Sequence, residues 1–372
     1  MLTLLIAFGA ALAITLLLVR ASAAGGGRAM DRDLDGPQKF HAAPVPRTGG
    51  VGIVCGLVAA LAVPALWGPP VMQGWWLLLC ALPAFLMGLA EDLTKRIGPL
   101  PRLLATMVSA LLAAGLLGAL LRTTDVPGFD WIASFTVGSL ALTVLVVAGL
   151  ANAVNIIDGF NGLASMCAAI MLAALAYVAY QVGDLLVATL ALAGVGAVLG
   201  FFVWNFPAGL IFLGDGGAYL LGFWFAELSL LMLVRNPGEV SPLCPLLICI
   251  YPVFETLFSI YRRRRRGASP GMPDGIHLHT LIYRRVLRWA IQDRSVRAMT
   301  LRNSMTSPYL WFLCMLGVVP AMLFWDRTPL IALSLVAFIA AYLALYWRIV
   351  RFRSPGWLHA ARRQLLRRRP RG

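Results

Sequence analysis

Long apolar runs recur along the chain and are separated by short polar segments. Each run is close to the roughly 20 residues that an α-helix needs to cross a bilayer. Helices are favoured here because backbone groups in lipid must bond within their own segment. We place the runs at residues 1–20, 49–67, 74–90, 102–121, 133–151, 164–180, 185–204, 216–234, 242–260, 308–325 and 329–347. The pattern predicts an all-α polytopic integral membrane protein with about 11 transmembrane helices.

The composition agrees with this prediction. Of the 372 residues, 60% are hydrophobic and 13% are charged, whereas about a quarter of an ordinary soluble protein is charged. The six cysteines are scattered through apolar runs without metal-ligand spacing, so we interpret them as small buried hydrophobic residues. Residues 1–350 are expected to form a single polytopic domain, and residues 351–372 a basic tail.

The basic residues indicate how the chain is oriented. If successive helices alternate in direction, all but three of the 31 Lys and Arg residues lie on one side of the membrane. This asymmetry follows the positive-inside rule, so we expect a periplasmic N-terminus and a cytoplasmic C-terminus. The net charge of +15 is then a topology signal, and the lack of a soluble domain argues against nucleic-acid binding. The predicted cytoplasmic loops are residues 21–48, 91–101, 152–163, 205–215 and 261–307.

Four acidic residues lie in these loops or at their edges. Glu91 and Asp92 end the third predicted helix and Asp158 ends the fifth, where the partial negative charge of a helix C-terminus disfavours a carboxylate. A divalent cation would make these positions favourable, and oxygen-only ligands suit Mg²⁺ or Mn²⁺. Asp215 lies among glycines, in a predicted loop whose backbone N–H groups can approach phosphate. Taken alone, each acid is better explained as an ordinary solvated loop residue, whereas the four together favour a functional cluster.

Amide and imidazole side chains accompany the acids. Asn152, Asn155 and Asp158 are spaced i, i+3 and i+6, so neighbours in the set lie on adjacent turns of a helix. Amides at this position can bind sugar hydroxyls or phosphate oxygens, or they can form structural bonds between helices. His277 and His279 lie in the last long loop and can either bind a phosphate or sugar oxygen or brace that loop.

Other charged residues are left without a chemical role. Glu227 and Glu255 fall within apolar runs, where a carboxylate is costly and needs partners. The basic run Arg262–Arg266 is expected to anchor the preceding helix at the membrane surface, with the gathering of anionic lipid or substrate as the alternative.

Together, these motifs resemble those of one family. Five polar segments are similar in sequence and order to those of the polyprenyl-phosphate N-acetylhexosamine-1-phosphate transferases, from Lys39 to about Arg285, and "NAVNIIDGFNGLA" at 152–164 is the most specific. The resemblance implies a Mg²⁺-dependent phosphoglycosyl transferase. Such an enzyme moves an N-acetylhexosamine-1-phosphate from a UDP-sugar to undecaprenyl phosphate and releases UMP. It also implies a bacterial cytoplasmic (inner) membrane protein with a cytoplasmic active site and, as in relatives, a homodimer.

The resemblance also implies roles for particular residues. Asp215 matches the principal metal ligand, and Asp92 with Glu91 matches an acidic pair that binds metal or deprotonates the lipid phosphate. Asn155 and Asp158 match a polar pair that binds the nucleotide. Further implied substrate-binding positions are Lys39, His41, Arg47, Asn152, Asn161, His277 and His279. Glu91, Asp92 and Asp158 are therefore the expected catalytic residues, and Asp92 and Asp215 the expected metal ligands.

The chain departs from the family pattern at several positions, three of which bear on the predicted site. Glu91 stands where the family usually has Asp, so we assign the base or metal role to Asp92. Asn161 stands where Asp is usual and cannot be a charged ligand or a base, and Thr280 follows His279 where a second histidine is common. The departures favour an enzyme that initiates O-antigen or exopolysaccharide synthesis over a phospho-MurNAc-pentapeptide transferase, the lipid I synthase.

Two other classes of protein share part of this pattern. A transporter of lipid-linked sugars should carry polar residues at mid-membrane depth, and this chain's mid-membrane segments are nearly all apolar. An inactive relative that serves as a membrane partner would fit the departures. The retained Asp92, Asp158 and Asp215 favour activity instead.

Overall fold

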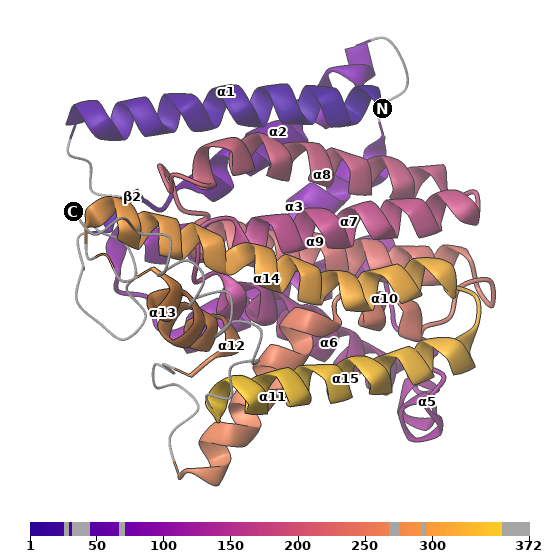
Figure 1. Cartoon of the computed structure of the whole chain (residues 1–372). Coiled ribbons are helices and arrows are strands. Elements are labelled where there is room, and N and C mark those ends of the chain that lie inside the picture. The colour runs from indigo at the N-terminus through magenta and orange to yellow at the C-terminus, as the bar shows by residue number, and fades with distance from the viewer. Residues whose placement is uncertain are drawn as a thin grey trace.

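Long helices run side by side in one bundle (Figure 1). The computed structural model describes residues 1–25, 30–31, 45–66, 71–267, 276–291, 293 and 295–351. The helices are α1 (Leu2–Gly25), α2 (Gly49–Ala62), α3 (Met72–Thr94), α4 (Pro99–Leu117), α5 (Pro127–Ala133), α6 (Thr136–Ile157), α7 (Leu163–Gln181), α8 (Leu185–Asn205), α9 (Gly214–Arg235), α10 (Leu243–Ile248), α11 (Ile250–Arg265), α12 (Leu278–Leu281), α13 (Arg288–Ala290), α14 (Val296–Leu323) and α15 (Thr328–Val350). A 3₁₀ turn at Pro64–Leu66, a π-helical segment at Ile282–Leu287 and a two-residue antiparallel pair of β1 (Met30–Asp31) with β2 (Val45–Pro46) complete the described elements.

The all-α polytopic prediction is confirmed. Ten helices in the described part of the chain are long and apolar enough to cross a membrane: α1, α2 with its 3₁₀ turn, α3, α4, α6, α7, α8, α9, α14 and α15. The predicted span at 242–260 differs, because it forms the two shorter helices α10 and α11. Pro252 explains the break. It has no N–H to donate to the carbonyl of Ile248, and that bond would otherwise join the two helices.

The last long loop is also shorter than the sequence pattern predicted. Helix α14 begins at Val296 rather than near residue 308. Ser295 caps it, since its hydroxyl accepts a hydrogen bond from the N–H of Ala298 at 3.2 Å. Five of the polar residues that made 296–307 look like a loop are buried against other parts of the protein, among them Asn303 at 4% and Ser307 at 0% exposure.

Helix α9 forms the centre of the bundle. Within the most apolar 18-residue stretch of α9, 89% of the residues are buried, against 17% in the corresponding stretch of α1 and 22% in that of α15. Its main neighbours are α3 and α6. The cysteine prediction is also confirmed, because all six are free thiols and only Cys55 is not fully buried.

Glycines bring three backbones into contact at the start of α9. A Cβ on Gly88 of α3 would lie 2.5 Å from the amide nitrogen of Gly216, and one on Gly50 of α2 would lie 2.6 Å from that of Gly217. No side chain fits in such a contact. Small residues therefore set how closely α2 and α3 approach the first turn of α9.

A second glycine contact holds α1 against α8. Gly196 and Gly200 are four residues apart on α8, and a Cβ on either would run into the backbone carbonyl of Leu4 or Phe8 on α1. Trp204, one turn further along α8, donates its indole N–H to the carbonyl of Leu12 at 3.0 Å. This is the spacing by which membrane helices commonly approach each other.

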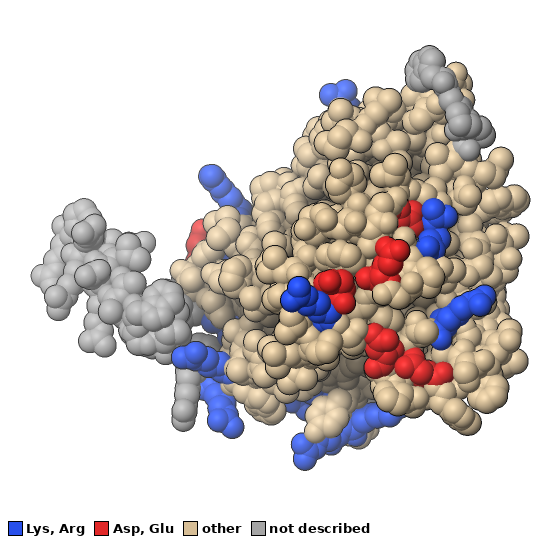
Figure 2. Space-filling model, turned by 90° about the vertical axis from the view of Figure 1, so that its right-hand side faces the viewer, with Lys and Arg blue, Asp and Glu red and all other residues tan. Residues whose placement is uncertain are grey.

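The two ends of the bundle differ in charge. One end, on the left in Figure 1, holds the last residues of α3 and α6 and the first residues of α9. The other end holds the loops 122–130, 181–184, 235–241 and 326–328, and Figure 2 shows acidic side chains gathered on it among a few basic ones. Its basic residues are Arg122, Arg235 and Arg327.

Candidate functional site

Three aspartates from three helices meet at the left-hand end of the bundle, which we call the acidic end after these carboxylates and not after its surface charge. Asp92 lies in the last turn of α3, Asp158 directly follows α6, and Asp215 lies in the first turn of α9. The carboxylate of Asp92 accepts the N–H of Gly216 at 3.0 Å, and the side-chain amide of Asn155 donates to Asp215 at 3.0 Å. The three sequence motifs therefore join in one polar cluster.

Asp92 has an oxygen without a partner. Its side chain is only 1% exposed, and within the described residues its Oδ1 has no hydrogen bond. Arg47 and Lys95 are its charged neighbours and stabilise the carboxylate, while Glu91 opposes it. A buried carboxylate oxygen with no donor is costly. A cation bound beside this oxygen would compensate that cost.

Asp215 is held by an arginine that the sequence pattern did not single out. Arg102 of α4 forms an ion pair with Oδ2 of Asp215, while Asn155 binds Oδ1. Asp215 lies within helix α9 rather than in the predicted loop, and the first turn of a helix favours a carboxylate. One signal for Arg102 was available. It stands in the first turn of its own helix, where a cation is disfavoured.

Asp158 is partly buried at the end of α6. Burial raises the pKa of its carboxyl to about 7; the charge of Arg47 lowers this value and that of Asp92 raises it. A carboxyl with a pKa near neutrality can exchange a proton at physiological pH. Arg47 lies between two acids of the cluster and therefore belongs to it.

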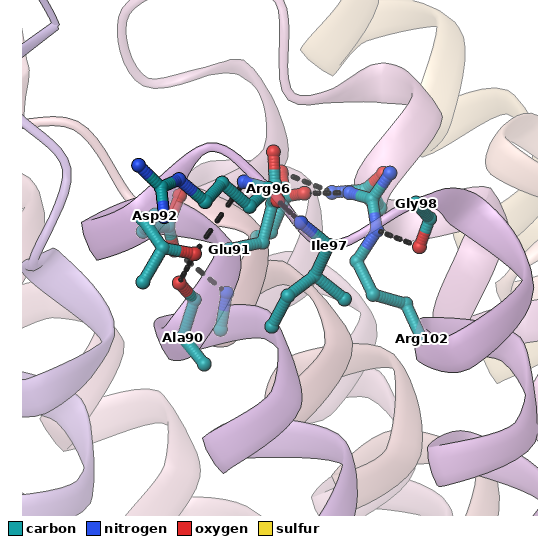
Figure 3. A network of polar contacts seen from close by, with 11 residues as sticks. Ala90, Glu91, Asp92, Arg96, Ile97, Gly98 and Arg102 are labelled. Carbon is teal, nitrogen blue, oxygen red and sulfur yellow. Dashed lines mark hydrogen bonds and ion pairs between the residues drawn. The ribbon is translucent and has the colours of Figure 1, made fainter.

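Glu91 has a different environment from Asp92. Its Oε2 accepts the N–H of Ile97 at 2.6 Å, closing the turn that follows α3 (Figure 3). In the same turn, Arg102 donates from Nε to the carbonyl of Gly98 at 3.2 Å. The extra methylene of Glu relative to Asp lets Glu91 shape the loop that presents Arg102. The preference for Asp92 over Glu91 in the base or metal role remains a prediction.

Asn161 and Asn152 bind the protein itself. Asn161 is 5% exposed and donates its side-chain amide to the carbonyl of Pro207 and to the hydroxyl of Ser304, both at 3.3 Å. An aspartate could not donate to that carbonyl, which explains an amide at this position. Asn152 donates to the carbonyl of Ala148 within α6 at 2.8 Å. Among the described residues, neither side chain is hydrogen-bonded to the aspartate cluster.

The two histidines lie against the loop that follows α6. His277 and His279 are 3% and 4% exposed and their rings are stacked, with centroids 5.1 Å apart. A Cβ on Gly159, the residue after Asp158, would lie 3.3 Å from Nε2 of His279. The histidine loop therefore reaches the acidic end. Lys39 and His41, the other predicted substrate-binding residues, lie outside the described residues.

The cluster suits a divalent ion that binds oxygen atoms and takes only one or two of its ligands from the protein. Across the described ranges, no three His, Cys, Asp or Glu residues are close enough to form a complete metal cage. Mg²⁺ is usually bound by one or two carboxylates, with water and substrate phosphates as the remaining ligands. Asp92, with its unpartnered oxygen, and Asp215 fit that requirement.

Comparisons with known proteins point to the same segment. Residues 75–233, which contain all three aspartates, match glycosyl transferase family 4. The chain is 31% identical over 244 residues to a probable undecaprenyl-phosphate N-acetylglucosaminyl 1-phosphate transferase of Bacillus subtilis, covering 65% of this chain and 66% of that protein. It is 29% identical over 278 residues to a decaprenyl-phosphate N-acetylglucosaminephosphotransferase of Mycolicibacterium smegmatis, covering 64% and 65%. It is 32% identical over 202 residues to a phospho-N-acetylmuramoyl-pentapeptide-transferase of Geobacillus kaustophilus, covering 50% and 60%. The matched region thus spans just under two thirds, at most, of these relatives' length.

Proposed function

Because this chain belongs to glycosyl transferase family 4, we propose that it transfers an N-acetylhexosamine-1-phosphate from a UDP-sugar to undecaprenyl phosphate and releases UMP. The relatives' names, which specify polyprenyl-phosphate acceptors and N-acetylglucosamine phosphate, support this choice. The product would be the first lipid-linked sugar of a cell-envelope glycan.

One observation carries the proposal. The Asp92–Gly216 and Asn155–Asp215 hydrogen bonds join three helix ends in one polar cluster at the edge of an apolar bundle. A lipid phosphate lies at that depth when its chain is in the bilayer. Water-soluble nucleotide sugar can reach the same place from the adjoining solution. Arg47 and Arg102 supply positive charge for phosphate there.

The reaction exchanges one phosphoanhydride bond for another. An oxygen of the lipid phosphate attacks the phosphorus that carries the sugar, and the bond from that phosphorus to the oxygen of UMP breaks. A phosphate monoester has a second pKa of about 6, so the lipid phosphate can arrive with a proton. Asp158, whose pKa burial raises to about 7, is matched to accept it.

Asp92 and Asp215 are the residues that would hold Mg²⁺ in this proposal. When bound, the ion neutralises phosphate charge that grows during the transfer. Arg102, which pairs with Asp215, would place its guanidinium beside this site for a phosphate oxygen. Asn155 holds the Asp215 carboxylate in place.

We place the acidic end at the cytoplasmic face of a bacterial inner membrane. The basic residues support this orientation, because the described loops at the opposite end carry Arg122, Arg235 and Arg327 while the runs near the acidic end carry most of the others. UDP-sugars are made in the cytoplasm, which agrees with it.

Phospho-N-acetylmuramoyl-pentapeptide transfer is the second candidate, supported by the similarity to the Geobacillus protein. Asn161 favours the N-acetylhexosamine reaction, because the family's muramoyl enzymes usually carry Asp there. In this chain the amide donates to Pro207 and Ser304 instead.

A donor comparison tests the function. The purified protein would be given undecaprenyl phosphate with UDP-N-acetylglucosamine or UDP-N-acetylmuramoyl-pentapeptide, and UMP would be measured with Mg²⁺ and with EDTA. We expect lipid-dependent and Mg²⁺-dependent release from the N-acetylhexosamine donor. Release from the pentapeptide donor alone would select the second candidate. Folded protein that is silent with both, and with other UDP-amino sugars, would refute the transferase proposal and favour an inactive relative.

A further inference from the structure

Glu255 is a buried carboxylate with three donors around it. It lies in α11 at 0% exposure. Its Oε1 lies 2.9 Å from Nδ1 of His277 and accepts the N–H of Leu278 at 3.2 Å, and its Oε2 accepts the hydroxyl of Tyr342 at 2.6 Å. Three separate segments of the chain, α11, the start of α12 and α15, therefore converge on one carboxylate.

These contacts determine where His277 carries its proton. A carboxylate surrounded by an N–H and an O–H donor is an acceptor, so Nδ1 of His277 donates and Nε2 is the remaining nitrogen. The other titratable or charged groups around this pair are His279, Tyr251 and Arg262. The guanidinium of Arg262 lies over the Phe258 and Tyr346 rings and donates to the carbonyl of Ile276.

The orientation of the His277 ring constrains that of the His279 ring, which lies beside the cluster. The two rings are nearly parallel, at 12°, so the plane of one restricts the plane of the other. Phe160 also packs edge-on against His279, with centroids 5.5 Å apart. The Nε2 edge of His279 lies over Gly159, which follows Asp158.

We propose that Glu255 is a positioning residue for the histidine pair. By holding the proton on Nδ1 of His277 and fixing its ring, it holds His279 with its Nε2 edge at Gly159, where that nitrogen binds a phosphate oxygen of the nucleotide sugar. The inference rests on the proposed function for the identity of the ligand. Tyr342 supports the same carboxylate from α15. Glu255 itself does not touch the substrate.

Two substitutions of Glu255 separate its role in positioning His277 from the space that its side chain fills. Glu255→Gln keeps an acceptor, and the N–H of Leu278 keeps the amide oxygen on the side of His277; its amide nitrogen then faces the Tyr342 hydroxyl. Glu255→Met has a similar length and no acceptor. We expect the Kd for UDP-N-acetylglucosamine and kcat/KM to worsen roughly 10- to 100-fold in Glu255→Met and only about threefold in Glu255→Gln.

Histidine-selective ¹⁵N NMR reads the same inference without turnover. The wild-type protein and Glu255→Gln should carry the His277 proton on Nδ1, and Glu255→Met should lose that preference. The matched control is Asp184→Asn, which changes a buried carboxylate at the opposite end of the bundle. It should change neither the ¹⁵N signals nor the Kd. A wild-type proton on Nε2 alone, or unchanged binding in folded Glu255→Met, would overturn the inference.

A substitution beside His279, rather than at Glu255, tests the same inference if Glu255→Met does not fold. Gly159→Ala would place a methyl group 3.3 Å from Nε2 of His279 without touching Glu255. We expect the Kd for UDP-N-acetylglucosamine to rise about fivefold or more, against no change in Gly149→Ala, whose Cβ would meet nothing within 4 Å. An unchanged Kd in Gly159→Ala would count against the positioning role. Binding that responds as expected in protein that releases no UMP would refute the proposed reaction and leave this inference standing.

Discussion

Helix α9 has an aspartate–arginine pair at each end, and the two pairs differ in the carboxylates that surround them. At the C-terminal end, Arg235 donates to Asp184 at 2.8 Å, Asn236 donates to the same oxygen, and the other oxygen of Asp184 accepts the N–H of Val187. Every oxygen there has a donor from the protein. At the acidic end, Asp215 is paired with Arg102, but the neighbouring Asp92 keeps a buried oxygen without a donor.

The difference separates a structural pair from a functional one. The Asp184–Arg235 pair is satisfied by the protein alone and holds segments of the chain together. Three carboxylates gathered with a deficit of donors are electrostatically unfavourable in the protein alone, and their placement makes sense when a cation or a phosphate-bearing substrate completes the site. Similar residues thus serve two purposes on one helix, and the neighbouring carboxylates, one of them with an unfilled oxygen, distinguish the two ends.

The sharpest test exchanges one oxygen for nitrogen at each end. Asp215→Asn should lower UMP release roughly a thousandfold or more, because the amide cannot hold a divalent cation in the same way. Asp184→Asn should leave kcat within about threefold while lowering the melting temperature, since it weakens only the contact to Arg235. Steady-state rates and thermal melts of the two variants give the comparison. Equal loss of activity in both would mean that the ends do not differ in function.

The arginines of the two pairs provide the next test. Arg102→Met should reduce kcat/KM for the UDP-sugar roughly 10- to 100-fold, since the proposal uses this guanidinium for phosphate. Arg102→Lys should recover part of the loss because it retains the charge. Arg235→Met is the control and should preserve kcat/KM. A full rate in Arg102→Met would assign Arg102 a structural role like that of Arg235.

Backbone contact at the acidic end gives a smaller, stability-based effect. Gly88→Ala would place a methyl group 2.5 Å from the Gly216 nitrogen, displacing the N–H that Asp92 accepts. We expect a loss of about 1–3 kcal/mol of stability from overpacking, together with reduced activity. Gly115→Ala, whose Cβ would meet nothing within 4 Å, should be neutral or stabilising. Calorimetry on both variants tests this prediction. Equal melting temperatures would contradict the close contact between Gly88 and Gly216.

The smallest expected effect concerns Asp158 and pH. The folded protein holds a proton on this carboxyl up to about pH 7, whereas the unfolded chain releases it near the ordinary pKa of 3.8. Because the folded state binds more protons across that window, its stability falls as pH rises through it. In EDTA, Asp158→Asn should therefore gain roughly 2–4 °C in melting temperature relative to wild type at pH 8, and no gain at pH 4. A constant difference across the range would contradict the raised pKa.

The sequence was sufficient to predict the helices and the meeting of the aspartates, but not the contacts between side chains. Apolar runs of membrane length locate helices directly, and their alternation places Asp92, Asp158 and Asp215 at one end. The break at Ile248 was readable from Pro252. The pairing of Arg102 with Asp215 joins residues 113 positions apart, and no local pattern encodes such a pair.

The early start of α14 was missed for the same reason. Residues 296–307 look like a loop because they are polar. Their partners lie in the loop after α6: Asn303 accepts the N–H of Asn161 at 2.8 Å, and Ser307 donates to the carbonyl of Asn161 at 2.6 Å. Polarity signals a loop only when the polar groups face water, and here they face another part of the protein.

The glycine contact between α1 and α8 also constrains the order of biosynthesis. Helix α1 leaves the ribosome early, but Gly196 and Gly200, against which it packs, are made roughly 10–35 seconds later at ordinary rates of translation. During that interval α2 is the main described neighbour of α1 in the growing chain. A nascent chain released before residue 196 would therefore present an unassembled first helix to the membrane's quality-control proteases, and one released after residue 205 would not.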